Sequence, residues 1–193
     1  MFHSANNSLQ YLTIWRYPNF KTLSDCLYNL TGLEIRECKN LELLPYQRQK
    51  LTSLTSLEIF NCENINAPLA QWGLTRLTSL KHLSIGGIFL NTTSFSDNHH
   101  LNLLPTTLTS LFISRFQNLE SLASLSLQTL TSFEELRISD CPKLQSILPR
   151  EEPLPATLSQ LYLRNCPVLK QRCSKEKGED WPKIAHIPYV EIN

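Results

Sequence analysis

Apolar residues recur along the chain at steps of two and three residues, a spacing that neither a long helix nor a long strand produces. Between Ser132 and Pro149, the two-residue step from Leu136 to Ile138 is typical of a short strand that shows one face to a core. The three-residue steps around it are typical of a coil that keeps returning to the same core. This stretch therefore predicts one turn of a solenoid.

The same frame, L-x-x-L-x-I-x-x-C/aromatic-x-x-L, occurs seven times. Its second leucine falls at Leu12, Leu33, Leu57, Leu83, Leu111, Leu136 and Leu161. Successive copies are 21 to 28 residues apart, which is the range of leucine-rich repeats. The sequence thus predicts an α/β repeat fold, a leucine-rich-repeat solenoid or horseshoe, with a parallel concave β-sheet and one elongated domain.

The frame also predicts where the elements lie. Seven strands are expected near residues 11–15, 32–36, 56–60, 82–86, 110–114, 135–139 and 160–164. The array occupies residues 1–173, and residues 174–193 form a C-terminal cap that ends in a strand at Tyr189 to Ile192. Because of Gly178, Pro182 and Pro188, we expect coil rather than helix before that strand.

The segments that return from one strand to the next are expected to form an irregular convex side of short-helix, 3-10 and coil structure. Some contain an extra leucine step that favours a helical or 3-10 turn, namely residues 51–54, 74–80 and 127–133. Others contain short proline turns, namely residues 104–105 and 154–155. The longest return, residues 86–107, is predicted to protrude, either as a solvated insertion or as a contact loop.

The start of the array lacks an obvious cover. Residues 1–8 are polar and too few to cap the first repeat, and the ends of solenoids normally carry a polar cap. We therefore expect this chain to be a fragment or a truncated product of a longer protein.

Outward-facing strand positions are the candidate functional residues, because they line the concave surface of the sheet. Those that we single out for protein binding are Trp15, Arg36, Phe60, Phe112, Glu135, Arg137, Tyr162 and Arg164. With strands about 4.8 Å apart, Arg36 would lie between Trp15 and Phe60, and Arg137 between Phe112 and Tyr162. These side chains either satisfy one another on a wet sheet or form two binding patches separated by Ser84 and Gly86.

Charge and motifs narrow the functional classes. Eighteen Lys and Arg against 17 Asp and Glu leave a net charge of +1, which does not favour nucleic acid as a partner. No apolar run approaches the roughly 20 residues of a membrane span. No phosphate-binding loop or nucleophile motif occurs, so we predict no enzyme activity, no catalytic residue and no cofactor-binding or metal-binding residue in this chain.

The positions of the cysteines indicate whether the protein resides in a reducing or an oxidising compartment of the cell. Four of the six occupy one slot of the frame, just after the strand: Cys38, Cys62, Cys141 and Cys166. Equivalent slots predict small buried thiols beside backbone carbonyls, in a reducing interior, rather than disulfides or a metal site. The glycosylation sequons at Asn6, Asn29 and Asn91 leave an extracellular alternative open.

Five segments also resemble a known family. They are PLAQWGLTRLTSLKHLSIGG (68–87), LLPTTLTSLFIS (103–114), NLESLASLSLQTLTSFEELRISDCPKL (118–144), LPATLSQLYLRNCPVLKQRC (154–173) and GEDWPKIAHIPYVEI (178–192). They resemble the C-terminal leucine-rich repeats of plant intracellular nucleotide-binding disease resistance proteins of the coiled-coil class. The coiled-coil and nucleotide-binding domains of such receptors are absent from this sequence.

The resemblance implies a protein-binding module of an innate-immune receptor, in the cytoplasm or nucleus. The expected partners are a pathogen effector or guarded host protein and the receptor's own nucleotide-binding domain, which the array holds inactive. ADP or ATP is expected only in that absent domain. Two alternatives remain at this point: a substrate-recruiting leucine-rich-repeat subunit of a ubiquitin ligase, whose repeats also carry a Cys after the strand, and an extracellular receptor ectodomain.

Overall fold

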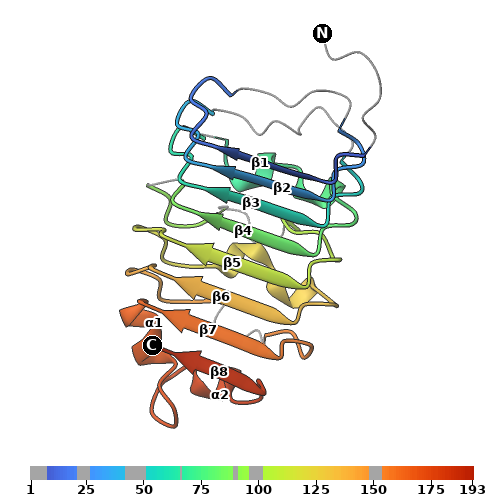
Figure 1. Ribbon diagram of the computed structural model, residues 1–193. Helices are drawn as coiled ribbons and strands as arrows, with labels where there is room; N and C mark the ends of the chain where they lie inside the picture. The colour runs from blue at the N-terminus through green and yellow to red at the C-terminus, as the bar shows by residue number, and fades with distance from the viewer. Residues whose placement is uncertain are drawn as a thin grey trace.

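The fold is an open parallel sheet that winds along one side of a solenoid. The computed structural model describes residues 8–20, 27–41, 51–65, 67–88, 91–95, 102–147 and 154–193. Its strands, in sheet order, are β1 (Tyr11–Trp15), β2 (Gly32–Arg36), β3 (Ser56–Phe60), β4 (His82–Gly86), β5 (Ser110–Ser114), β6 (Glu135–Ser139), β7 (Gln160–Arg164) and β8 (Tyr189–Ile192). The seven predicted strands are confirmed at their predicted bounds, and the cap adds the eighth (Figure 1).

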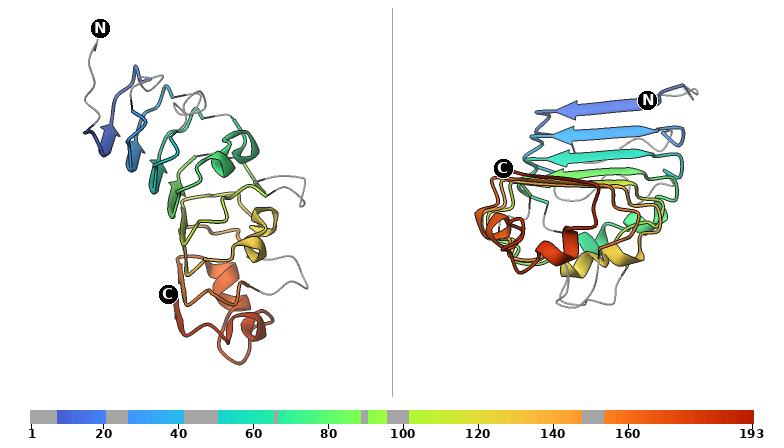
Figure 2. Two further views of the ribbon diagram at one scale, coloured as in Figure 1. Left: turned by 90° about the vertical axis from the view of Figure 1, so that its right-hand side faces the viewer. Right: turned by 90° about the horizontal axis from the view of Figure 1, so that it is seen from below.

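Pairing in the sheet is in register throughout. Each strand is parallel to its neighbour, and equivalent frame positions face each other, as Leu12 faces Leu33 and Ile14 faces Ile35. The sheet lies on one side of the molecule and the short helices lie on the other (Figure 2). The predicted leucine-rich-repeat solenoid, with its parallel concave sheet, is therefore confirmed.

A left-handed residue directly follows each of the first seven strands. These residues, with φ from 51° to 61°, are Arg16, Glu37, Asn61, Gly87, Arg115, Asp140 and Asn165. The backbone N–H of each donates to a carbonyl at the end of the next strand along the sheet, over 2.9 to 3.3 Å. This turn reverses the chain toward the core, and the extra hydrogen bond offsets the strain of a positive φ in residues other than glycine.

The core is a single cluster of inward-facing side chains. Frame leucines and isoleucines such as Leu33, Ile35 and Leu136 are almost completely buried. Trp72 is also almost completely buried, and its Nε1 donates to the carbonyl oxygen of Ala67 over 2.9 Å. The apolar frame read from the sequence is thus the scaffold of the molecule.

Four of the cysteines occupy the same position in their repeats, two residues after the end of the strand. The Sγ of Cys38, Cys62, Cys141 and Cys166 each lies 3.3 to 3.5 Å from the carbonyl oxygen of the last strand residue, two positions earlier. Burial raises the pKa of the Cys62 thiol to about 11 and that of the Cys173 thiol to about 12. The predicted role as small hydrophobes beside turn carbonyls is confirmed for these positions.

The convex side is irregular, as predicted. The described residues contain four 3-10 turns, η1 (Leu69–Gln71), η2 (Leu74–Arg76), η3 (Ala123–Leu125) and η4 (Leu127–Thr129). η2 and η4 lie in two of the predicted leucine steps, whereas η1 and η3 directly precede those steps and were not predicted. Residues 51–54 form a plain turn instead, in which Leu54 N–H donates to the Leu51 carbonyl over 3.1 Å. Proline turns at Pro105 and Pro155 accept hydrogen bonds from Leu108 and Leu158.

Only part of the longest return lies among the described residues. Residues 89–90 and 96–101 fall outside them, as do residues 1–7 with the Asn6 sequon. Phe95, within this return, is buried and packs edge-on against Phe116 at a centroid distance of 5.3 Å. This part of the return therefore belongs to the core rather than to a protruding loop.

Two helices near the C-terminus were not predicted by the sequence analysis. α1 (Pro167–Arg172) follows β7 at the end of the array, and α2 (Trp181–Ile184) lies in the part of the cap that was expected to be coil. The expectation was wrong because Pro182 lies in the first turn of α2, where its missing N–H has no intrahelical acceptor to lose. The strand β8 at Tyr189–Ile192 is confirmed. None of the helices in the described part of the chain has the length and apolar character needed to cross a membrane.

Asp180 holds the cap together. Its carboxylate accepts from Arg172 Nε over 2.7 Å and from Lys183 Nζ over 2.8 Å. Burial opposes ionisation of this carboxyl, but the hydrogen bonds and charges of Arg172 and Lys183 outweigh burial, so the pKa of Asp180 lies below its usual 3.8. The cap thus depends on an ionised aspartate.

A first prediction tests which residues face the core. Leu136→Ala removes a side chain that is 0% exposed and should lower the free energy of unfolding by about 2–5 kcal/mol. Arg137→Ala is the matched control on the same strand and should cost about 0–1 kcal/mol, since its ion pair lies at the surface. Urea unfolding of the 193-residue chain measures both, and equal losses would contradict the facing.

A second prediction concerns pH. Because the pKa of Asp180 is lower in the folded than in the unfolded chain, its charge stabilises the fold above pH 3.8, and this contribution is lost as the pH falls through and below that value. Asp180→Asn should therefore lower the urea midpoint at about pH 7. The gap between the urea midpoints of the variant and the unmodified chain should narrow as the pH falls below 3.8, and a gap that stays constant would count against this role.

Candidate functional site

Outward positions of the sheet form the candidate site, and the structure places all eight predicted residues on the concave side of β1 to β7. Their exposure differs widely: Trp15 is 59% exposed, whereas Phe60 is only 7% exposed. Arg137 and Arg164 are exposed, and the others are half-buried. The ring of Phe60 is therefore buried although it faces outward, because Arg36 and Phe112 pack against it.

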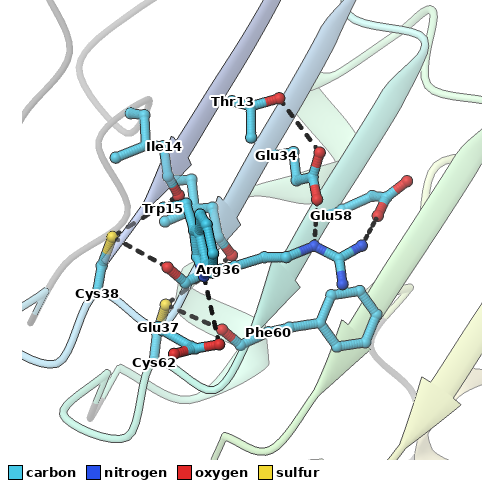
Figure 3. Close-up of polar contacts among 11 residues, drawn as sticks. Thr13, Ile14, Trp15, Glu34, Arg36, Glu37, Cys38, Glu58, Phe60 and Cys62 are labelled. Atoms are coloured by element: carbon cyan, nitrogen blue, oxygen red, sulfur yellow. Dashed lines mark hydrogen bonds and ion pairs between the residues drawn. The ribbon is translucent and has the colours of Figure 1, made fainter. Parts of the chain in front are cut away.

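Arg36 occupies the centre of the N-terminal half of this face (Figure 3). Its guanidinium binds the carboxylates of Glu34 and Glu58, the latter over 2.8 Å, and Thr13 donates to Glu34 over 3.2 Å. It also lies 4.7 Å from the ring centroid of Phe60. The positive charge of Arg36 is therefore already paired with two carboxylates of the same chain.

Trp15 does not form the second wall that we predicted for Arg36. Instead Arg16, the left-handed residue after β1, lies over the Trp15 ring at 4.6 Å. Trp15 Nε1 and Arg16 Nε both donate to Glu37, over 3.3 and 2.6 Å. The hydrogen bonds from Arg16 and then Trp15 lower the pKa of Glu37. Residues of the left-handed turns, which the sequence analysis did not consider, thus take part in the surface.

Phe60 and Phe112 bridge the zone that was expected to separate two patches. Their rings lie 6.0 Å apart at 49°, although β4 runs between their strands. Gly86 permits this, because a Cβ there would lie 2.9 Å from Phe60 and 2.4 Å from the Ser114 hydroxyl. We call Arg36, Phe60 and Phe112 the N-terminal stack.

A second stack covers the C-terminal half. The Arg137 guanidinium lies 4.6 Å from the ring centroid of Tyr162 and pairs with Glu135 over 2.6 Å. The Tyr162 ring in turn lies 5.3 Å from that of Tyr189 in β8. We call Arg137, Tyr162 and Tyr189 the C-terminal stack. Each arginine therefore contacts one predicted ring rather than two, and Tyr189 joins because β8 continues the register.

A pocket of about 540 Å³ opens between the two stacks. Phe112 of the N-terminal stack and Arg137 and Tyr162 of the C-terminal stack line it, and it extends as far as Glu191 in β8. Its walls include Ser84, Ser110, Phe112, Arg137, Tyr162 and Arg164. The arrangement is that of an open binding surface, with aromatic walls and charged groups at its margin.

Comparisons with known proteins identify relatives along most of the chain. No family model matches it. A putative disease resistance protein of Arabidopsis thaliana is 32% identical over 187 aligned positions, and the match covers 85% of this chain and 13% of the relative. A probable disease resistance protein of the same plant, RF45, is 28% identical over 201 alignment positions, gaps included, and the match covers 95% of this chain and 17% of the relative. The chain thus spans less than a fifth of these two relatives.

Two further matches add less. The putative disease resistance protein RGA4 of Solanum bulbocastanum is 41% identical over 51 residues, 26% of this chain and 5% of that protein. Among solved structures, an internalin from Listeria monocytogenes aligns with 97% of this chain and 81% of its own at 16% identity, with a TM-score of 0.25. That score is too low to support an argument, so the fold rests on the sheet itself.

A third prediction tests the contact between the phenylalanine rings. Gly86→Ala adds a Cβ that collides with Ser114 and Phe60, so it should lower the free energy of unfolding by about 1–3 kcal/mol. Ser84→Ala, on the same strand, removes an outward hydroxyl and should stay within about 0.5 kcal/mol. Urea unfolding compares the two, and a Gly86→Ala chain as stable as the Ser84→Ala chain would refute the close packing.

Proposed function

We propose that this chain, a leucine-rich-repeat array homologous to plant disease resistance proteins, is the protein-binding module of a plant innate-immune receptor. In that role it binds a pathogen effector or a guarded host protein through its concave face. Through the same face it also holds the receptor's own nucleotide-binding domain inactive until that partner arrives.

The observation that carries the proposal is the concave face itself. Two stacks of arginine and aromatic side chains flank a pocket of about 540 Å³ on an open sheet. Arginine, tyrosine and tryptophan are the residue types that contribute most of the energy at protein interfaces. Homology to resistance proteins along 85% of the chain supports the biological setting.

The remaining roles belong to other parts of the receptor. ADP or ATP binds the nucleotide-binding domain, and we assign no nucleotide, metal or catalytic residue to this chain. The receptor acts in the cytoplasm or nucleus, where the buried thiols of the repeats stay reduced. Its partners are proteins rather than nucleic acid, in keeping with a net charge of +1.

A fourth prediction tests this function in leaf cells. Tagged chain is co-expressed with the cognate nucleotide-binding domain, encoded by the same gene or by its genomic neighbour. The chain should co-precipitate with that domain and suppress the cell death that the domain causes alone. Trp15→Ala and Arg137→Ala should weaken co-precipitation at least fivefold, because both remove exposed concave side chains.

Gln128→Ala is the matched control, because Gln128 is exposed on the convex turn η4. It should leave both co-precipitation and suppression unchanged. Absence of both effects in the unmodified chain would refute autoinhibition. Equal losses in the concave and convex variants would refute the assignment of the binding face.

A further inference from the structure

We infer that the pocket between the two stacks takes an extended acidic segment of a partner protein, with a carboxylate on Arg164 and an apolar or aromatic side chain beside Phe112. The inference rests on the proposed function, in which the concave face binds proteins, and it specifies the chemistry of the partner. Two features of the pocket support it: its charged side chains and the residues that line it.

The charged groups at the pocket are Glu135, Arg137, Arg164 and Glu191. Glu135 and Arg137 pair with each other over 2.6 Å. The Glu191 carboxylate accepts hydrogen bonds from the Tyr189 hydroxyl over 3.1 Å and from Asn193 Nδ2 over 2.5 Å. These three groups are therefore engaged within the protein.

Arg164 differs from the other three. Within the described residues its guanidinium forms no ion pair and no hydrogen bond, and the residue is exposed. A guanidinium offers five N–H donors in a planar fork that matches a carboxylate. The other charged side chains at the pocket already have partners within the protein. The N–H donors of Arg164 are therefore the ones that an acidic side chain of a ligand would bind.

Aromatic and small side chains define the rest of the pocket. Phe112 and Tyr162 are half-buried, so each keeps apolar surface for a ligand. The lining also includes two small residues, Ser110 on β5 and Ser139 on β6, and the Ser110 hydroxyl donates to Glu135 over 3.0 Å. β5 and β7 lie two strand spacings apart, about 10 Å. An extended segment covers that distance with about three residues, which separates its apolar anchor from its carboxylate.

The N-terminal half of the face provides a contrast within the same protein. There Arg16 pairs with Glu37, and Arg36 pairs with Glu34 and Glu58. An acidic ligand would have to displace a carboxylate from either arginine, whereas at Arg164 it displaces only water. The preference for an acidic segment is therefore local to the pocket.

A fifth prediction tests this preference with a phage-displayed library of random dodecapeptides, selected on the immobilised 193-residue chain. Enriched peptides should carry an Asp or Glu within about four residues of an aromatic or large aliphatic residue. In a synthetic copy of the strongest peptide, replacing the acid by its amide should weaken binding at least tenfold in fluorescence anisotropy. Raising the salt concentration should also weaken binding.

The matched variants are Arg164→Gln and Arg115→Gln. Arg115 is also exposed, but it lies in the turn after β5 and does not line the pocket. Arg164→Gln should weaken the peptide at least tenfold, and Arg115→Gln should change it less than twofold. Both variants should unfold at the same urea concentration as the unmodified chain, because neither side chain packs in the core.

Three outcomes would overturn the inference: enrichment of peptides without acidic residues, equal effects of the two arginine variants, or no enrichment on the folded chain. None of these outcomes touches the co-precipitation with the nucleotide-binding domain or the suppression of cell death. The proposed function can therefore stand while the acidic preference falls. Loss of both co-precipitation and peptide binding would instead remove the concave face as a binding surface.

Discussion

In-register pairing of parallel strands is the constraint on which the rest of the molecule depends. Because Leu faces Leu and Ile faces Ile from β1 to β6, one inward face is apolar along its whole length and buries a continuous core. The same pairing arranges the outward residues in straight columns. The neighbours of a side chain on the concave face are therefore the residues at the equivalent position in the two adjacent repeats.

The left-handed turn after each strand keeps that register despite return segments of unequal length. It occurs at residues as different as Arg16, Asn61 and Gly87, so it follows from the backbone path rather than from a preference for glycine. Each turn donates a backbone hydrogen bond to the next repeat, which ties neighbouring repeats together at the point where the chain leaves the sheet. The thiols beside these turns and the ionised Asp180 in the cap complete the scaffold.

The binding character of the concave face comes from how its side chains lean. Phe60 can reach Phe112 only because Gly86 leaves the space above β4 empty, and Arg137 leans the other way, onto Tyr162. Because of these two contacts, the boundary between the stacks lies between β5 and β6 rather than at β4, where the sequence analysis expected it. The pocket extends from that boundary to β8, and its lining includes Arg164, whose guanidinium has no partner among the described residues.

The sequence alone determined the strands, their facing and the buried thiol slot, because inward positions repeat with a period that can be counted along the chain. It also brought out all eight concave candidates, whose roles in binding stay predictions. Only the tertiary structure decided which ring each arginine contacts, because an outward side chain can lean toward either neighbouring strand, and carboxylates such as Glu34 and Glu58 compete with the rings. It likewise decided α2, since Pro182 excludes a helix interior but not a first turn, and a residue count does not tell the two apart.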